Sequence, residues 1–162
     1  ESVVGEGSTF RVRLPATQIA AQTTPRDVAA RPNEQAPVHR GQFLVVDDDL
    51  NVANTLGMLL GFQHDVLVLT QAKQALELLL GGARFDGIFC DLMMPEMTGM
   101  DLHRALVGTA SEQAERMVFV TGGAFTEAAQ AFLASVPNDR TEKPFIASEL
   151  DAIVRRRVAA AR

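Results

Sequence analysis

The 162-residue chain contains no tryptophan, no tyrosine and only one cysteine, Cys90. One cysteine cannot form an intramolecular disulfide, and this usage fits a reducing compartment. The chain also lacks an apolar run long enough to cross a membrane, and its opening sequence ESVVGEGSTF has neither the basic nor the apolar region of a signal peptide. Because the chain begins at Glu1 rather than methionine, we expect a fragment of a longer protein. From the single cysteine and the missing signal peptide, we expect this fragment to be cytoplasmic. This fragment itself would make no membrane contact, which leaves a membrane-associated parent protein open.

Basic residues are too few to balance the acidic ones. Fifteen Lys and Arg against 20 Asp and Glu give a net charge of −5 and a pI near 5.2, which argues against nucleic acid or an anionic membrane as a partner. Hydrophobic residues make up 47% of the chain, enough for a buried core, so global disorder is excluded. The three histidines, His39, His64 and His103, have no metal-ligand spacing, and we expect them at the surface.

The composition changes sharply near Gly41. Residues 16–41 are rich in Ala, Gln, Thr and Pro and show little apolar periodicity, as expected of a linker. Before them, residues 10–14 alternate between apolar and basic side chains, which predicts a half-buried strand. One strand cannot fold alone, so it would belong to a domain that precedes this segment. We therefore divide the chain into an N-terminal extension over residues 1–15, a linker over 16–41 and a main domain over 42–162.

The main domain alternates short apolar runs with amphipathic segments. This alternation predicts an α/β fold in which a parallel sheet carries helices on both faces. Strands are predicted over residues 43–47, 66–69, 87–90, 117–120 and 140–142. Helices are predicted over residues 51–60, 72–80, 101–107 and 126–135, and from Ser148 onward, where SELD forms a capping-box-like start. Val52, Leu56 and Leu59 are the expected buried face of the first helix.

Three consecutive acids, Asp47, Asp48 and Asp49, follow the buried run FLVV. Two like charges about 4 Å apart repel by about 4 kcal/mol at an effective dielectric constant of about 20, and an ordinary turn needs only one Asp or Asn. Either the acids are spread into water, or a cation holds them together. Asp49 alone is explained as the N-cap of the helix that follows.

Functional side chains also follow three other predicted strands: Asp91 the third, Thr121 the fourth and Lys143 the fifth. In open α/β sheets, ligands bind beyond the carboxyl ends of the strands, so these groups should meet the first acids at one edge. Converging carboxylates without Cys or His favour Mg²⁺, and an ammonium with a hydroxyl suits phosphate oxygens. The combination predicts a phosphoryl site with a carboxylate nucleophile. Cys90 is expected to be a buried thiol rather than a redox group.

The motifs VVDDD, FCDLMMPEMTG, VFVTGG and EKPF occur in order and at fitting spacing. At these residues the sequence, from about Gly41 onward, resembles the receiver (response-regulator) family of two-component signalling. The resemblance implies a flavodoxin-like, doubly wound, five-stranded parallel sheet. It makes Asp91 the phosphoacceptor, Thr121 the switch hydroxyl and Lys143 the phosphate-pairing ammonium, and it implies a cis bond before Pro144. The implied Mg²⁺ ligands are Asp47, Asp48, Asp91 and the backbone carbonyl of Met93.

The residues GEGSTFRVRLP resemble the last glycine-rich turn and strand of a histidine-kinase ATP-binding domain. With the linker and the receiver-like domain, they predict the C-terminal part of a bacterial hybrid sensor histidine kinase. The receiver would take a phosphoryl group from a phosphohistidine of a histidine kinase or a histidine phosphotransfer protein. It would catalyse its own phosphorylation and dephosphorylation and then switch a protein-interaction surface. A homodimer is compatible with this role.

Two other functions stay open. Many receivers have Tyr or Phe three residues before the lysine, where this chain has Arg140. Because of this departure, a receiver-like interaction module that is never phosphorylated remains an alternative function. The run DDDLN also resembles the start of haloacid-dehalogenase-type phosphatases, in which Asp47 would be the nucleophile and Asp49 the acid/base.

Overall fold

The computed structural model describes residues 2–3, 7–8, 40–123 and 126–160. The chain divides into two compact units, Glu1–Gln35 and Ala36–Arg162. In the first unit, β1 (Ser2–Val3) pairs with β2 (Gly7–Ser8) in an antiparallel ladder. The strand predicted over residues 10–14 and nearly all of the predicted linker lie outside the described residues.

The second unit is built on a five-stranded sheet in the order β4-β3-β5-β6-β7, and every pair of neighbours is parallel. Its strands are β3 (Gln42–Val46), β4 (Asp65–Leu69), β5 (Gly87–Asp91), β6 (Met117–Thr121) and β7 (Asp139–Glu142). Its helices are α1 (Leu50–Gly61), α2 (Ala72–Leu80), α3 (Gly99–Val107), α4 (Ser111–Glu115), α5 (Glu127–Ser135) and α6 (Ala147–Ala160). This architecture confirms the predicted doubly wound α/β fold.

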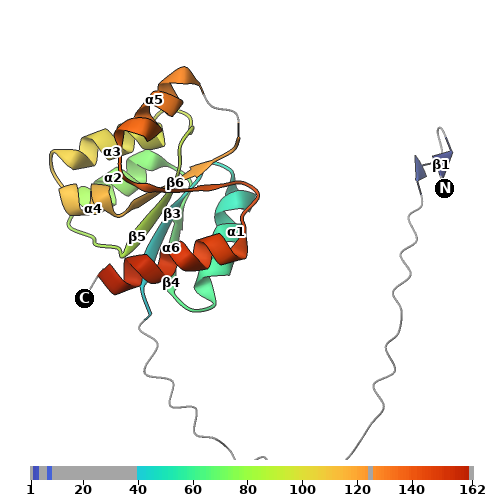
Figure 1. The fold of residues 1–162 in the computed structure, drawn as a ribbon, viewed down its shortest axis with the longest axis horizontal. Helices are drawn as coiled ribbons and strands as arrows, with labels where there is room; N and C mark the ends of the chain where they lie inside the picture. The colour runs from blue at the N-terminus through green and yellow to red at the C-terminus, as the bar shows by residue number, and fades with distance from the viewer. Residues whose placement is uncertain (1, 4–6, 9–39, 124–125, 161–162) are drawn as a thin grey trace, which may run out of the picture. The chain divides into compact units, whose positions relative to one another are not determined.

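The helices cover both faces of the sheet (Figure 1). On one face, α1 and α6 pack against side chains of β3, β5 and β6 such as Phe43, Phe89 and Val120. On the other face, α2, α3 and α5 pack against Leu44, Ile88 and other alternate residues of the same strands. The three central strands are therefore buried on both faces, which is why they read as continuous apolar runs in the sequence.

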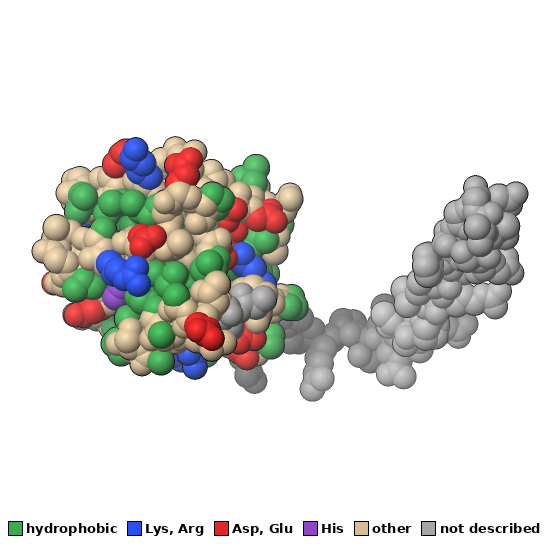
Figure 2. Space-filling model, turned by 90° about the horizontal axis from the view of Figure 1, so that it is seen from above, with side chains coloured by type: hydrophobic (Ala, Val, Ile, Leu, Met, Phe, Trp, Pro, Cys, Tyr) green, Lys and Arg blue, Asp and Glu red, His purple; other side chains and the backbone are tan. Residues whose placement is uncertain are grey.

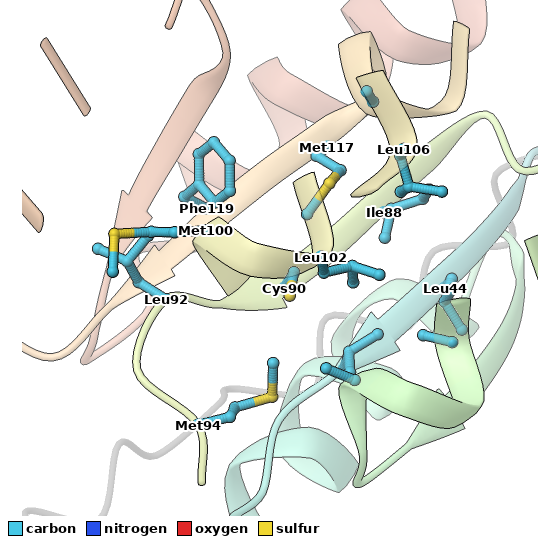
Figure 3. Close-up of a cluster of buried hydrophobic side chains, with 14 of the residues drawn as sticks. Leu44, Ile88, Cys90, Leu92, Met94, Met100, Leu102, Leu106, Met117 and Phe119 are labelled. Atoms are coloured by element: carbon cyan, nitrogen blue, oxygen red, sulfur yellow. The ribbon is translucent and has the colours of Figure 1, made fainter. Parts of the chain in front are cut away.

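The core under α3 is the larger of the two hydrophobic clusters (Figure 3). Leu102 and Leu106 project from α3 toward Ile88 and Cys90 of β5, and Met117 and Phe119 join them from β6. The thiol of Cys90 is fully buried, and burial raises its pKa well above the ordinary range. The prediction that Cys90 is a buried thiol is confirmed.

Several local predictions were wrong. The buried residues of α1 are Ala53, Leu56 and Leu60, whereas Leu59 is 42% exposed, so the helix is turned relative to the predicted face. The short helix α4 was not predicted, because its apolar content is small. Helix α6 begins at Ala147, which places Ser148 inside the helix.

The histidine prediction was also wrong in part. His103, on the sheet side of α3, is only 8% exposed and lies edge-on to the rings of Phe119 and Phe132. His64 is half-buried, and His39 lies outside the described residues.

The surface shows no strong segregation of charge on the face seen in Figure 2, where acidic and basic side chains are interspersed with hydrophobic ones. None of the helices in the described ranges is both long and apolar enough to cross a membrane.

Candidate functional site

The candidate site lies where the strand order reverses. Strand β3 pairs with β4 on one side and with β5 on the other, so the connections from β3 and β5 leave in opposite directions. This is the position at which open α/β sheets bind ligands. Asp47 follows β3 directly and Asp91 is the last residue of β5, and the two strands are in register at Val46 and Cys90.

Lys143 joins the two carboxylates. Its Nζ atom lies 2.7 Å from Oδ2 of Asp47 and 2.7 Å from Oδ1 of Asp91. The residue follows β7, whose end is tied to the end of β6 because the Lys143 N–H donates to the carbonyl of Thr121 at 2.8 Å. The Lys143–Pro144 bond is cis, as predicted. Three strand ends thus place one ammonium between two acids.

Backbone N–H groups hold the other oxygens of these acids. The N–H of Asp49 donates to Oδ1 of Asp47 at 3.0 Å, and the N–H of Met93 donates to Oδ2 of Asp91 at 2.9 Å. In each carboxylate, therefore, one oxygen accepts a hydrogen bond from a backbone N–H and the other contacts the Lys143 ammonium. This arrangement fixes both side chains and directs the Lys143-bound oxygens toward the same point.

The two acids of the site are charged groups that are largely buried from solvent. Asp47 is 3% exposed and Asp91 is 7% exposed. Burial raises the pKa of Asp47, Lys143 opposes this, and the Asp91 charge adds to the increase. Burial also works against the charge of Lys143, but the hydrogen bonds and charges of the two acids outweigh it and raise the pKa of Lys143. The ammonium thus stays protonated at neutral pH.

Thr121, the last residue of β6, borders the site. Its side chain is buried, and its hydroxyl donates to the carbonyl of Thr141 at 3.3 Å, near the long limit for such a bond. The carbonyl of Thr141 was not predicted as a partner, because backbone acceptors carry no sequence signal.

The remaining predicted groups lie around this pair. Asp48 is exposed and lines a crevice together with Thr70, Lys73 and Glu96. Met93 is 46% exposed. Among the described residues, no group of three or more His, Cys, Asp or Glu side chains is arranged to hold a metal ion. Of the three acids, Asp47 and Asp91 are the two that Lys143 contacts.

The donor chemistry nevertheless fits a divalent cation. Asp47, Asp48 and Asp91 carry three negative charges against the single positive charge of Lys143, which leaves two to be neutralised. All available donors are oxygens, which are the ligands that Mg²⁺ prefers.

Asp49 has a structural task. It is the N-cap of α1, where its Oδ1 accepts a hydrogen bond from the N–H of Asn51 at 2.9 Å, as predicted. Arg140 lies exposed on β7. It pairs in register with Phe119, which places it on the α5 side of the sheet.

Gly99, the last residue of the motif FCDLMMPEMTG, was not predicted to have a role of its own, but it packs against the backbone of Asp91. A Cβ atom at this position would collide with the carbonyl oxygen of Asp91 and would lie 3.2 Å from Cys90 Sγ. The N–H of Gly99 also donates to the carbonyl of Leu92 at 3.1 Å. The start of α3 therefore rests directly on the backbone of Asp91, with no room for a side chain.

Comparison with known proteins agrees with this geometry. Residues 43–155 match the family model of the response regulator receiver domain. The sensor histidine kinase AtsR of Burkholderia thailandensis is 32% identical over 96% of this chain and 26% of its own length. The aerobic respiration control sensor protein ArcB of Escherichia coli is 27% identical over 94% of this chain and 19% of its own length. The chain thus spans about a quarter or less of these two relatives.

Solved structures show the same fold. The receiver domain of the Francisella response regulator 1452 superimposes with a TM-score of 0.62 at 26% identity, covering 76% of this chain and all of that domain. The receiver domain of a signal transduction histidine kinase from Syntrophus aciditrophicus gives a TM-score of 0.65 at 23% identity, over 75% of this chain and 92% of that one.

Proposed function

Because the chain belongs to the response regulator receiver domain family, we propose that it accepts a phosphoryl group from a phosphohistidine onto Asp91. The observation that supports this most directly is the pairing of Asp91 with Lys143 at 2.7 Å, beside the second acid Asp47. A carboxylate that is oriented by a backbone N–H and adjoins an ammonium is suited to attack phosphorus.

In the proposed transfer, a carboxylate oxygen of Asp91 forms a bond to phosphorus while the bond from phosphorus to the donor's imidazole nitrogen breaks. The imidazole leaves with the bonding electron pair. Lys143 neutralises charge on the transferring group, and the N–H of Met93 keeps the carboxylate oriented. Such positioning and charge neutralisation are the main catalytic contributions available in phosphoryl transfer.

Asp47, Asp48, Asp91 and the backbone carbonyl of Met93 would hold Mg²⁺, which when bound supplies positive charge to the phosphoryl oxygens. The net charge of the acids against Lys143 is what supports this assignment.

Thr121 is the proposed switch residue. Its hydroxyl hydrogen bond to Thr141 is long, so exchanging it for a phosphoryl oxygen costs little. The acyl phosphate would draw Thr121 toward Asp91 and shift an equilibrium between two conformations of the neighbouring surface.

The phosphoryl donor is proposed to dock near α1. Several apolar side chains on or directly after this helix are exposed, among them Met58 at 68% and Phe62 at 79%. Leu50, which is 56% exposed, lies at the end of α1 next to the acids, and Met58 and Phe62 lie toward its other end. Exposed apolar side chains along the helix suit a protein partner such as a histidine kinase or a histidine phosphotransfer protein. The similarity to sensor histidine kinases across nearly the whole chain supports a hybrid kinase as the parent protein.

The deciding experiment is incubation of the chain with Mg²⁺ and acetyl phosphate, followed by intact-mass measurement. We expect one phosphoryl group on the wild type and on neither Asp91→Asn nor a sample without Mg²⁺. A phosphoryl group that persists in Asp91→Asn but disappears in Asp47→Asn would favour a phosphatase-like nucleophile. No adduct on wild type, with Mg²⁺ binding confirmed by titration, would favour the interaction module.

A further inference from the structure

The point at which the chain enters the receiver is fastened to the turn between α1 and β4. The N–H of Gly41 donates to Nδ1 of His64 at 3.2 Å, and the carbonyl of Gly41 accepts from the N–H of Asp65 at 2.9 Å. The Arg40 guanidinium donates to the carbonyl of His64 and to Oδ1 of Asp65, both at 3.1 Å. Four hydrogen bonds thus hold two consecutive residues.

One of these four bonds depends on the protonation state of a side chain. Nδ1 of His64 can accept the Gly41 N–H only when it carries no proton, so the bound ring is neutral with its hydrogen on Nε2. The ring also lies edge-on to Phe43, with centroids 5.0 Å apart. Protonation turns Nδ1 into a donor that faces another donor, and the bond cannot survive.

Gly41 has no side chain that could replace this contact. A Cβ atom there would lie 2.8 Å from Val158 and 2.9 Å from Phe43, so the position admits only glycine without rearrangement. The residue is buried. Once its N–H loses His64, that N–H must find water, which requires Gly41 to move away from the turn.

The charged ring has a second environment available. His64 lines a groove of about 390 Å³ between α1 and α6, whose opposite wall includes Asp151 and Arg155 of α6. These two residues form an ion pair at 2.6 Å. The Asp151 carboxylate in the groove can accept a hydrogen bond from the protonated ring, whereas the N–H of Gly41 cannot.

We propose that His64 is an acid-sensitive latch: its neutral ring holds Gly41 against the α1–β4 turn, whereas its protonated ring releases Gly41 and turns into the groove toward Asp151. The proposal concerns the junction and does not depend on phosphorylation of Asp91.

The charges around the ring set the range in which the latch works. Burial lowers the pKa of His64, and the positive charge of Arg40 lowers it further; the carboxylates of Asp151, Asp65 and Asp86 oppose both. Arg155, also on α6, lines the same groove. The neutral, latched form therefore persists to a lower pH than an unperturbed histidine would allow.

The test is an NMR titration of the ¹⁵N-labelled chain from about pH 8 to about pH 5. We expect the Gly41 amide resonance to move with the same midpoint as the His64 ring, and amide-exchange protection at Gly41 to fall roughly threefold to tenfold across it. In His64→Gln, whose side-chain oxygen can accept without titrating, the Gly41 shift should lose that midpoint. Asp151→Asn should keep the latch but lower the His64 midpoint.

Two results would overturn the proposal. One is a Gly41 resonance that does not follow His64 in the wild type; the other is a Gly41 titration that persists unchanged in His64→Gln. Labelling by acetyl phosphate, measured in parallel by mass, is expected to be the same in wild type and His64→Gln. This control separates failure of the latch from failure of the phosphoacceptor function.

Discussion

The ammonium nitrogen of Lys143 lies 2.7 Å from Oδ1 of Asp91, although 52 residues separate the two in the chain. The contact exists because β5 and β7 end at the same edge of the sheet, on either side of β6. It joins the expected nucleophile to the only cation within hydrogen-bonding distance of that carboxylate among the described side chains.

We predict that Lys143→Gln slows phosphorylation of Asp91 by acetyl phosphate while sparing much of the Mg²⁺ binding. The substitution also leaves the buried Asp47 carboxylate without its ammonium, so the free energy of unfolding at neutral pH should fall by about 1–3 kcal/mol. Labelling rate by mass, Mg²⁺ titration and urea denaturation measure the three effects. Lys143→Arg, which keeps the charge, is the matched control. Unchanged labelling and unchanged output in Lys143→Gln would refute the assigned role.

We predict that Gly99→Ala damages both stability and labelling, because its Cβ would collide with the carbonyl oxygen of Asp91. The backbone of the phosphoacceptor must then move, and overpacking of this kind costs about 1–3 kcal/mol. Gly108→Ala is the matched control at the other end of α3, since no atom in the part of the chain that the structure describes lies within 4 Å of its added Cβ. Equal labelling rates and equal unfolding free energies in the two variants would contradict a packing role for Gly99.

The groups of the site could be predicted because each one stands at the end of a predicted strand, and the carboxyl ends of parallel strands lie at a single edge of the sheet. Asp47, Asp91 and Lys143 were identified in this way, and the structure brings them together. The details that orient them could not be predicted. The N–H of Met93 and the carbonyl of Thr141 are backbone groups present at every such position, so only the folded loop shows which ones point at the site.

For the fold, too, some features could be predicted from the sequence and others could not. Apolar runs predicted four of the five strands, most clearly the three central ones, because residues buried on both faces leave a strong signal. The fifth strand, β7, has the polar sequence DRTE and was predicted only as a short stretch that ends at Lys143. His103 escaped prediction, since a histidine without metal-ligand spacing was expected to lie at the surface. Its burial comes from Phe119 and Phe132, which lie on elements far away in the sequence.

The buried His103 gives a prediction about pH. Burial lowers its pKa, the Asn138 side chain opposes this, and the charge of Arg104 adds to the decrease. The folded state therefore prefers the neutral ring, so its stabilisation is present above about pH 6.5, the unfolded value, and is lost as the pH falls through the folded value.

We expect the free energy of unfolding of the wild type to decrease from about pH 7.5 to about pH 5 by more than that of His103→Leu, which cannot titrate. Urea denaturation at several pH values measures the difference. Because the pKa of His64 is lowered as well, His64→Gln serves as a comparison that removes a separate contribution of the same sign. Parallel curves for wild type and His103→Leu would show that His103 does not titrate differently in the two states.

The lifetime of the acyl phosphate depends on what could position a water molecule beside it. Met93 follows Asp91 by two residues and is 46% exposed, and Gly123 follows Thr121 by two residues and is also exposed. Neither has a polar side chain that could orient an attacking water, so we predict a long-lived phosphoryl group. Met93→Asn should shorten the lifetime by supplying such a group, without strain because Met93 does not have a positive φ.

Gly123→Glu should act in the same direction, but the φ of 85° at Gly123 adds a backbone cost of about 1 kcal/mol. Loss of the phosphoryl mass with time, after removal of acetyl phosphate, measures the lifetime in each protein. Gly122→Ala, which adds no polar group and whose Cβ meets no atom of the described residues within 4 Å, controls for altered loop packing. Decay as fast in the wild type as in both polar variants would mean that water is positioned by some other group, and the side chains at 93 and 123 would then have no part in hydrolysis.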